Sequence, residues 1–392
     1  MARPILRTPI CDLLEIEYPV VLAGMGGVAS AELVAAVSDA GGLGIIGAAA
    51  MGPDEIEAQV TKVRDLTSKP FGVDILLPAG VGGPPRPPGG GERPTGERPQ
   101  LPSNLLELLP AEHQEFIRKA KAEFGLPETR PEADAGAPRA GRRMDPNFAQ
   151  RQVDAIVDLK VPIFASGLGN PAPYVEAFHA GGAKVIGLVG NVKNARRVAE
   201  GGSDIVVAQG HEAGGHTGRI GTLALVPQVV DAVSPTPVLA AGGVGDGRGI
   251  AAALALGAQG VWVGTAFLVS REANLSQLLK ERILAASEED TRVTRLYSGK
   301  TMRNITNPLI EFWERENLPA LPMGLQGIVS GEISAAARAA GKPELSMNPA
   351  GQIAGMLHES RPAREILEEL VTDAARIISE ELPRRVRVTV ET

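Results

Sequence analysis

The stretch PVLAAGGVGDGRGIAAALALGAQGVWVGTAF, residues 237–267, decides the fold of this chain. It holds two apolar runs, VLAA and GVWV, which end in the small-residue pairs Gly242–Gly243 and Gly264–Thr265. Both runs are continuously apolar rather than alternating, as in strands of a parallel sheet that are buried on both faces. The stretch therefore predicts two parallel strands joined by a helix.

Six further runs of this kind bring the total to eight, with helix-like segments between them. They are PVVLAG, LGIIGA, FGVDILL, VPIFASG, KVIGLVG and DIVVAQG. We expect one helix to begin near Ser30, a plausible N-cap, and the next to run from Pro53 to about Leu66. Eight β/α units predict an α/β fold of the (β/α)₈ TIM-barrel type more economically than a doubly wound sheet.

Composition narrows the class of protein. The chain of 392 residues is 44% hydrophobic but only 3% aromatic, which is typical of tightly packed α/β proteins. A net charge of −7 argues against nucleic acid as a partner. The single cysteine, Cys11, excludes an internal disulfide and a cysteine-based metal cluster. No signal-peptide core is visible, and the most apolar window contains Glu32 and Asp39, so we expect a cytoplasmic protein that does not enter the membrane.

The order of the runs predicts the domain organisation. The barrel would comprise residues 1–77 and 148–285, interrupted after the third strand by an insertion at 78–147. Beyond residue 285 the sequence loses its strand-like runs, which predicts a smaller helical domain at 286–361. A last helix, within 362–392, would return to the barrel wall. The sequence does not decide the oligomeric state, and a homodimer is possible.

The insertion has two kinds of sequence. Its first part is rich in Pro, Gly and Arg and cannot bury enough apolar surface to order itself, whereas NLLELLPAEHQEFIRKAKAEFG is amphipathic and predicts a helix. We expect a partly disordered, mobile loop, with a lid over the barrel mouth as the alternative. Arg142 and Arg143 at its end could meet an anionic substrate, although a solvated pair is the simpler interpretation.

Glycines after the seventh and eighth strands indicate a phosphate site. Loops at this place in a barrel commonly bind phosphate, because bare backbone N–H groups and a helix N-terminus can approach its oxygens. Gly242 and Gly243 precede a helix that should start near 246–249, and Thr265 adds a hydroxyl. The segment GVGDGRG fails the dinucleotide-binding GxGxxG pattern at Arg248, which argues against a Rossmann site.

Together with the loop AQGHEAGGHTG (208–218) and the N-terminal PVVLAGMGGVASAELVAAVSDAGGLGIIGA, this stretch closely resembles the nitronate monooxygenase family. The resemblance covers the eight barrel units and the closing GQIAGML, but not the insertion. It implies FMN at the C-terminal mouth of a TIM barrel. Flavin-dependent enoyl-acyl-carrier-protein reductases and some quinone reductases share these motifs.

The resemblance assigns cofactor contacts residue by residue. The phosphate would lie at Gly243 and the run Trp262, Val263, Gly264 and Thr265; the flavin would lie along Gln209 and Gly214 and beside the loop Gly24, Met25 and Gly26. In FGVDILLP this chain has Asp74 where the family usually has asparagine. An amide can donate and accept hydrogen bonds, whereas a carboxylate only accepts, so this position departs from the family pattern.

The resemblance also makes His216, in EAGGH, the catalytic residue. A histidine near its ordinary pKa can accept a proton from a nitroalkane carbon, or bind an anionic nitronate when protonated. We expect His211 to be structural or solvated, and the other three histidines, His113, His179 and His358, to be solvated. A metal site at His211, Glu212 and His216 is disfavoured because no fixed third ligand is evident.

The function implied is FMN-dependent oxidation of alkyl nitronates, and of nitroalkanes, by O₂ to a carbonyl compound and nitrite. One alternative is an NAD(P)H-dependent reductase of the same fold that acts on an enoyl thioester or a quinone. Another is a flavin-binding protein without catalysis, against which the intact EAGGH counts. A barrel of the inosine-monophosphate-dehydrogenase type would need a nucleophilic cysteine in a site loop, and Cys11 precedes the first strand.

Overall fold

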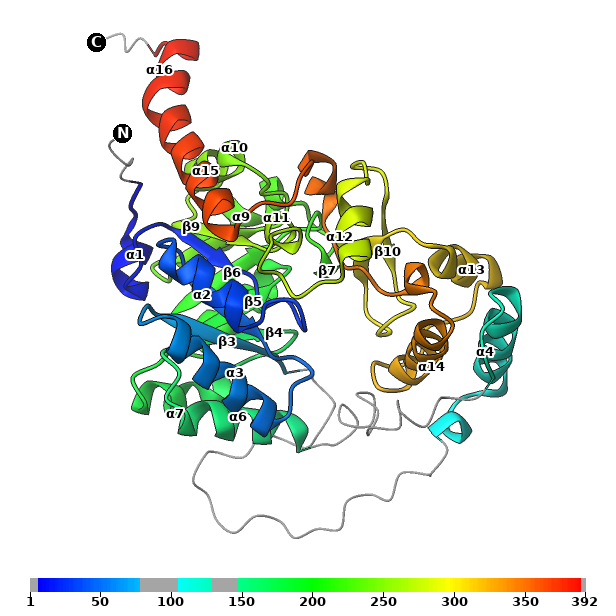
Figure 1. Ribbon diagram of the computed structural model, residues 1–392. Coiled ribbons are helices and arrows are strands. Elements are labelled where there is room, and N and C mark those ends of the chain that lie inside the picture. The colour runs from blue at the N-terminus through cyan, green and yellow to red at the C-terminus, as the bar shows by residue number, and fades with distance from the viewer. Residues whose placement is uncertain (1–5, 78–104, 129–146, 389–392) are drawn as a thin grey trace.

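The computed structural model describes residues 6–77, 105–128 and 147–388. Eight parallel strands form its central sheet, and each coincides with one of the eight apolar runs (Figure 1). They are β1 (Val20–Leu22), β2 (Gly44–Gly47), β3 (Phe71–Leu76), β4 (Ile163–Gly167), β5 (Lys184–Val189), β6 (Ile205–Gln209), β8 (Val238–Ala241) and β9 (Gly260–Val263).

The sheet closes on itself. Its order is β1-β9-β8-β6-β5-β4-β3-β2, with parallel pairing throughout. The two end strands meet where Leu22 N donates to Leu43 O at 2.8 Å and Leu43 N donates to Val20 O at 3.0 Å. The predicted TIM barrel is therefore confirmed.

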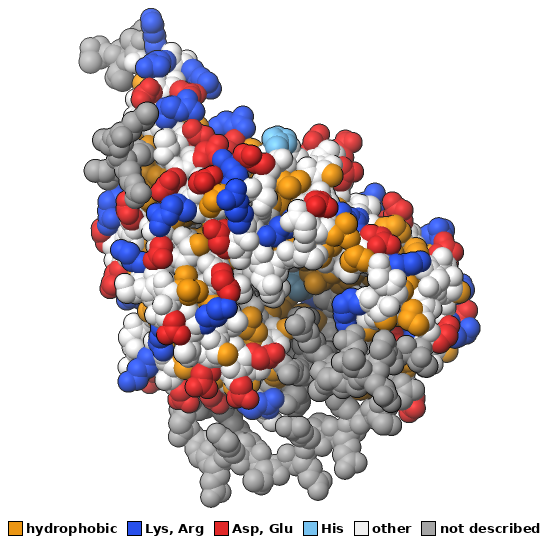
Figure 2. All heavy atoms as spheres, viewed as in Figure 1, with side chains coloured by type: hydrophobic (Ala, Val, Ile, Leu, Met, Phe, Trp, Pro, Cys, Tyr) orange, Lys and Arg blue, Asp and Glu red, His pale blue; other side chains and the backbone are white. Residues whose placement is uncertain are grey.

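Helices cover the outside of the barrel and pack on the outward-facing side chains of the strands. They are α2 (Ala31–Asp39), α3 (Pro53–Leu66), α6 (Phe148–Asp158), α7 (Val175–Ala180), α8 (Val192–Glu200), α9 (Thr222–Val233) and α10 (Gly247–Ala255). Ser30 occupies the N-cap position of α2 as predicted, but its hydroxyl bonds Glu32 instead of capping the helix. Acidic and basic side chains are interspersed over this outer surface (Figure 2).

The barrel interior is a second, separate apolar layer. Inward-facing aliphatic residues fill it, and the short helix α1 (Pro9–Leu14) closes its N-terminal end with Ile10, Cys11 and Leu14. Cys11 is buried here as a small apolar side chain. The N-terminal end of the barrel is thus sealed, which leaves the carboxyl ends of the strands as the place for a site.

A second lobe packs beside the barrel and contains strands that the sequence did not suggest. Strands β10 (Thr291–Thr294) and β11 (Met302–Ile305) form a hairpin, and β11 also pairs with β7 (Gly215–His216) from the loop after β6. The prediction that residues beyond 285 form only helices was wrong. The lobe's helices include α12 (Gln277–Leu284), α13 (Pro308–Glu316) and α14 (Leu325–Ala339), with η4 (Pro343–Leu345) after them.

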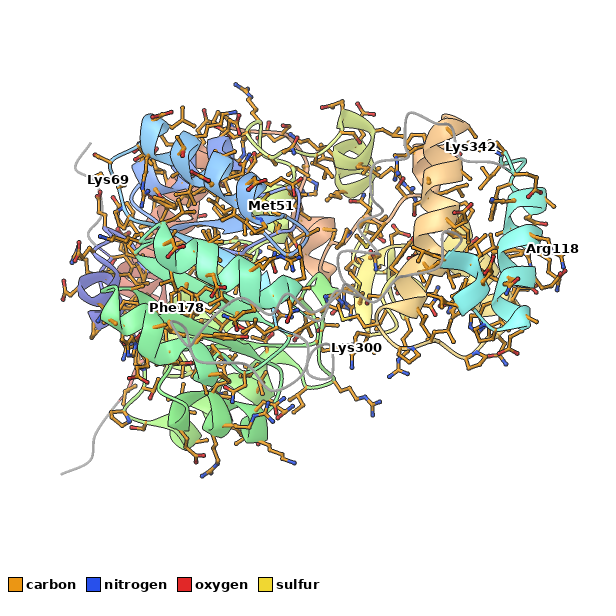
Figure 3. The ribbon with its side chains drawn as sticks, turned by 90° about the horizontal axis from the view of Figure 1, so that it is seen from below. Met51, Lys69, Arg118, Phe178, Lys300 and Lys342 are labelled. Carbon is orange, nitrogen blue, oxygen red and sulfur yellow. The ribbon has the colours of Figure 1, made fainter. Side chains whose placement is uncertain are left out.

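The amphipathic part of the insertion belongs to this lobe. After a turn η1 (Leu105–Leu108), helix α4 (Ala111–Glu123) buries Phe116 and Ile117 against α13 and α14, on the side away from the barrel (Figures 1 and 3). This segment is therefore a packed element and neither a free loop nor a cover over the strand ends. The Pro/Gly/Arg-rich part and Arg142–Arg143 lie outside the described residues.

The chain then returns to the barrel through η5 (Gln352–Met356) and α15 (Ala363–Arg376), whose apolar face packs on α10 and α2. It ends in a π-helical turn η6 (Ile377–Glu381) and α16 (Leu382–Arg385), which project beyond the barrel (Figure 1). Among the described residues, no helix combines the length and apolar character needed to cross a membrane.

Two of the three histidines expected to be solvated have partners. His113, on α4, is fully buried, with its Nε2 2.9 Å from the carbonyl of Pro319. His179 is partly exposed and lies 2.8 Å from the Asp204 carboxylate. His358 is exposed as expected. The helical pattern identified the segments but could not reveal partners that are distant along the chain.

Candidate active site at the carboxyl ends of the strands

The site is built on inward-facing positions near the carboxyl ends of several barrel strands. Side chains alternate between the two faces of a strand, so the residue two positions beyond an interior aliphatic residue also faces inward. By this rule Gln209 faces the interior, as do the glycines at 47, 167 and 264; Asp74 faces the interior because its neighbours Val73 and Ile75 pack on the outer helices. Small and polar residues thus replace aliphatic ones at this end.

The loop after β1 crosses this end of the barrel in direct contact with it. A Cβ atom added at Gly24 would lie 2.3 Å from the Cβ of Asp74, and one at Gly47 would lie 2.2 Å from the Met25 carbonyl oxygen. At Gly264 it would meet the Met25 sulfur at 3.5 Å. The glycines are therefore required for the backbone to approach, and they hold the predicted segment 24–26 against the site.

Asp74 lies beneath this loop and is only 7% exposed. Its Oδ1 accepts a hydrogen bond from Gly167 N at 3.1 Å. Burial raises the pKa of the Asp74 carboxyl to about 7, because desolvation disfavours the charged form more than this single hydrogen bond favours it. Both protonation states are consequently accessible near neutral pH.

The loop after β6 carries His216 to the junction between barrel and lobe. His216 lies on β7, and its main chain is fixed by pairing with Met302 on β11 and by the Gln209 side-chain amide, which donates to the His216 carbonyl. The His216 ring Nε2 lies 2.9 Å from Ser298 Oγ in the β10–β11 turn. Figure 3 places Lys300, in the same turn, between the barrel and the lobe.

His211 and Glu212, two further polar residues of this loop, brace it. The His211 ring Nδ1 lies 2.8 Å from the Gly218 carbonyl, and buried Arg303 donates to the His211 carbonyl. The Glu212 carboxylate accepts from the backbone N of Thr222 at 3.0 Å, at the start of α9, where negative charge is favoured. These bonds give His211 and Glu212 a structural role, as expected of His211.

The glycine pairs after β8 and β9 lie at the same end of the barrel. Gly242 and Gly243 have φ of +90° and +76°, a conformation that favours glycine. A Cβ atom added at Gly243 would lie 3.8 Å from the Cβ of Glu212, an ordinary van der Waals contact, so this position is not crowded. The buried Thr265 hydroxyl accepts from Gly351 N at 2.9 Å, which leaves its own hydrogen for donation.

The remaining predicted residues contribute through the main chain. The Trp262 side chain packs inside the barrel, and the Val263 side chain packs against the outer helices. Gly214 lies where a Cβ atom would be 2.6 Å from Ala350, so the loop after β6 is in contact with the segment that leads to η5. Every predicted residue therefore lies at the carboxyl ends of the strands or in the loops that follow them.

Two contributors were missed from sequence. Ser298 lies in the turn YSGK, which matches no motif, and it contacts His216 only because the β10–β11 hairpin extends β7. Gly351 positions Thr265, and the one available signal was its place at the start of GQIAGML. Among the described residues, no group of three or more His, Cys, Asp or Glu side chains is arranged to hold a metal ion.

Comparisons with known proteins agree with this arrangement. The family model described as Nitronate monooxygenase matches residues 7–373. A Staphylococcus aureus protein named "Probable nitronate monooxygenase" is 33% identical over 386 residues, covering 95% of this chain and 98% of that protein.

Two solved structures share the architecture. FabK from Thermotoga maritima is similar at a TM-score of 0.73 and 32% identity, covering 97% of this chain and all of that chain. The nitroalkane oxidase from Streptomyces ansochromogenes is similar at a TM-score of 0.76 and 28% identity, covering 94% and 99%.

Proposed function

We propose that this chain, which belongs to the nitronate monooxygenase family, binds FMN at the carboxyl ends of its barrel strands and oxidises alkyl nitronates with O₂. The chain is a flavin-type oxidoreductase, as its family and its nitroalkane oxidase neighbour indicate. The products would be a carbonyl compound and nitrite. The observation that carries the proposal is the convergence of His216, the 24–26 loop and the two glycine pairs at one end of a barrel whose other end is sealed.

The residues present fit an FMN phosphate. Gly243 offers backbone in a left-handed conformation at an uncrowded position, and Thr265 offers a hydroxyl hydrogen. Backbone N–H groups without side chains can approach phosphate oxygens closely. One phosphate site without a second nucleotide signature favours FMN over FAD. When bound, the flavin would supply the electron transfer from the nitronate to oxygen.

The chain's own residues would handle the proton and the substrate. His216 would accept the proton from the carbon beside a nitro group, or hold the nitronate anion when its ring is charged. Ser298 would keep the imidazole in one orientation through the 2.9 Å contact to Nε2. His211, Glu212 and Arg303 would keep the loop in place.

The test is which electron donor bleaches the flavin of the purified protein under anaerobic conditions. We expect a propyl nitronate to bleach it, and nitrite to accumulate once air is admitted. Bleaching by NAD(P)H alone would instead support a reductase, and no bleaching by either donor would support a binding protein. Cofactor released by heat should migrate as FMN on chromatography; FAD or riboflavin would contradict the phosphate assignment.

A further inference from the structure

The Asp74 carboxyl is enclosed on both sides near the carboxyl ends of the barrel strands. Its Oδ1 accepts from Gly167 N at 3.1 Å, and a Cβ atom added at Gly24 would lie only 2.5 Å from its Oδ2. The carboxyl is therefore held between the loop after β1 and the end of β4, with 7% of the residue exposed. It faces the end of the barrel to which the flavin is assigned.

Charged neighbours that could stabilise an Asp74 carboxylate are missing from the adjacent described loops. The segments 23–31 after β1, 48–53 after β2 and 168–175 after β4 contain no Asp, Glu, Lys, Arg or His. The charged groups at this end lie on other elements. Glu212 bonds Thr222, His216 contacts Ser298, Arg303 donates to the His211 carbonyl, and Arg248 pairs with Asp246 after β8. Lys193 at the start of α8, Arg219 in the loop after β6 and Lys300 in the β10–β11 turn complete the set, and the pKa of Asp74 is governed by burial and the Gly167 hydrogen bond alone.

We propose that Asp74 couples proton uptake to reduction of the bound flavin: the carboxylate takes one proton from solvent when the flavin gains electrons, and it returns that proton when the flavin is reoxidised. The proposal rests on the FMN site proposed above. The electrons come from the reductant, nitronate in the proposed reaction, and the only bond made on the protein is the O–H of Asp74. Asp74 is a positioning residue in this scheme and forms no bond to substrate.

The physical reason is the cost of two negative charges in a site with little water. Reduction adds electron density to the flavin, and like charges repel strongly where the effective dielectric constant is low. A neutral carboxyl removes that repulsion and gains a hydrogen that it can donate. Asparagine, which the family usually has here, donates at every pH and takes up no proton.

The direction of the pH dependence follows from the raised pKa of Asp74. Below about pH 7 the carboxyl is already protonated with the flavin oxidised, so reduction draws no additional proton. Above about pH 7 it is ionised, and reduction has to bring one in. The equilibrium constant for reduction should then fall by up to about tenfold more per pH unit than in a protein without the titrating group.

The test compares wild type, Asp74→Asn and Asp158→Asn, each loaded with FMN. The asparagine at 74 keeps an oxygen to accept from Gly167 N, so the fold should survive, and Asp158 is an exposed carboxylate at the end of α6 that controls for net charge. The equilibrium of the flavin with a reference redox dye would be measured from about pH 6 to 9, with a chemical reductant in place of nitronate.

In wild type and Asp158→Asn we expect the equilibrium constant for flavin reduction to fall more steeply with pH above about pH 7. In Asp74→Asn this steeper fall should be lost. Equal pH dependence in all three proteins would overturn the proposal. A carboxyl C=O infrared band that titrates in the wild type and is missing from Asp74→Asn would support it independently. The dye equilibrium uses no nitronate, so it is independent of the test of the proposed function. If nitronate fails to bleach the flavin, the proposed function is refuted, but the coupling between Asp74 and flavin reduction is not.

Discussion

The barrel and the second lobe are assembled from the chain in different ways. Apart from the β1–β9 pair that closes the barrel, each barrel strand pairs with the barrel strands before and after it in the chain, and the helices between them cover it. The lobe joins α4 to α13 and α14 across about half of the chain. Three ion pairs join these helices: Lys119 with Glu316 at 2.8 Å, Glu123 with Arg315 at 2.8 Å, and the buried Lys121 with Glu332 at 2.9 Å. Their partners are separated by 197, 192 and 211 residues.

Because of this difference, the barrel and the lobe contribute different residues to the site. The residues assigned to the cofactor come from the barrel and its loops, where repetition of one unit brings all strand ends together. The residue proposed to handle the proton depends on both regions, because His216 lies on a barrel loop but is oriented by Ser298 and β11 of the lobe. Variants in the barrel, at the junction and in the lobe should therefore fail in different ways.

The largest effect is expected in the barrel, at Gly243. Gly243→Asp should yield almost flavin-free protein, because it adds left-handed strain of about 1–2 kcal/mol and a charge beside the phosphate worth about 4 kcal/mol at short range. Together these approach 10⁴-fold in FMN affinity. Fluorescence titration of the apo-protein with FMN measures this.

Gly243→Ala is the matched control, since its Cβ atom has space and it adds strain without charge. It should weaken FMN binding by only about tenfold. Undiminished FMN binding by the aspartate variant would show that the phosphate lies elsewhere, and the assignment of the cofactor to the barrel would fail.

The next effect is expected at the junction. His216→Asn should slow oxidation of neutral nitroalkanes by about 10²–10⁴-fold, because their carbon proton must be removed, while largely sparing preformed nitronates. Steady-state kcat/KM on both substrate forms, at equal FMN occupancy, gives the answer. His211→Asn, which removes only a ring contact to the Gly218 carbonyl, should be mild in both assays.

If His216 mainly binds the anion, both substrates should suffer through a higher KM. Full activity of His216→Asn on both forms would remove any catalytic role for this residue, and with it the view that the junction handles the proton.

A smaller effect on function is expected in the lobe. Phe116 is 1% exposed and packs edge-on against Trp313 with ring centroids 5.1 Å apart. Phe116→Ala should lower the free energy of unfolding of the lobe by about 3–5 kcal/mol while FMN stays bound. Phe178→Ala removes a ring that stacks on Phe164 in the barrel wall. It should lower the free energy of unfolding of the barrel by a similar amount, and FMN should be released as the barrel unfolds.

Denaturant unfolding followed by both tryptophan and flavin fluorescence separates the two outcomes, provided that Trp262 inside the barrel is first replaced by Phe so that Trp313 in the lobe is the single tryptophan. Coincident loss of both signals in Phe116→Ala would show that lobe and barrel unfold as one unit. The two regions would then differ in how the chain forms them, but not in when they unfold.

The same difference explains how far the sequence predicts the structure. Barrel strands are buried on both faces, so they appear as uninterrupted apolar runs, and all eight were identified. The β10 and β11 segments, TRVT and MRNI, carry arginines and an asparagine and look unlike strands. Arg303 can be buried there because the His211 carbonyl and Thr291 accept its hydrogen bonds.

The site follows the same division. The placement of its barrel residues could be predicted, because the pattern defines the strand ends and the small residues follow them directly, whereas the roles of these residues were implied by the family resemblance and stay predictions. Ser298 could not, since its contact with His216 spans 82 residues and depends on the hairpin. The burial of His113 was missed for a similar reason, because its partner is the Pro319 carbonyl, 206 residues away.

The smallest effect is expected for Ser298→Ala, which tests whether the lobe orients His216. Ser298 is 4% exposed, and its hydroxyl lies 2.9 Å from Nε2 of His216. Loss of one neutral hydrogen bond costs about 0.5–1.5 kcal/mol, so kcat/KM on neutral nitroalkanes should fall by roughly three- to tenfold, with nitronates unaffected. Because the hydroxyl contacts the imidazole that would accept the proton, the pH profile of the rate should also shift, a change that mere loosening of the fold would not cause. Ser298→Thr, which keeps the hydroxyl, should restore both the rate and the profile. Wild-type rate and pH profile in Ser298→Ala would show that β7 pairing alone positions His216, and the contribution of the lobe would then be the backbone of β11 only.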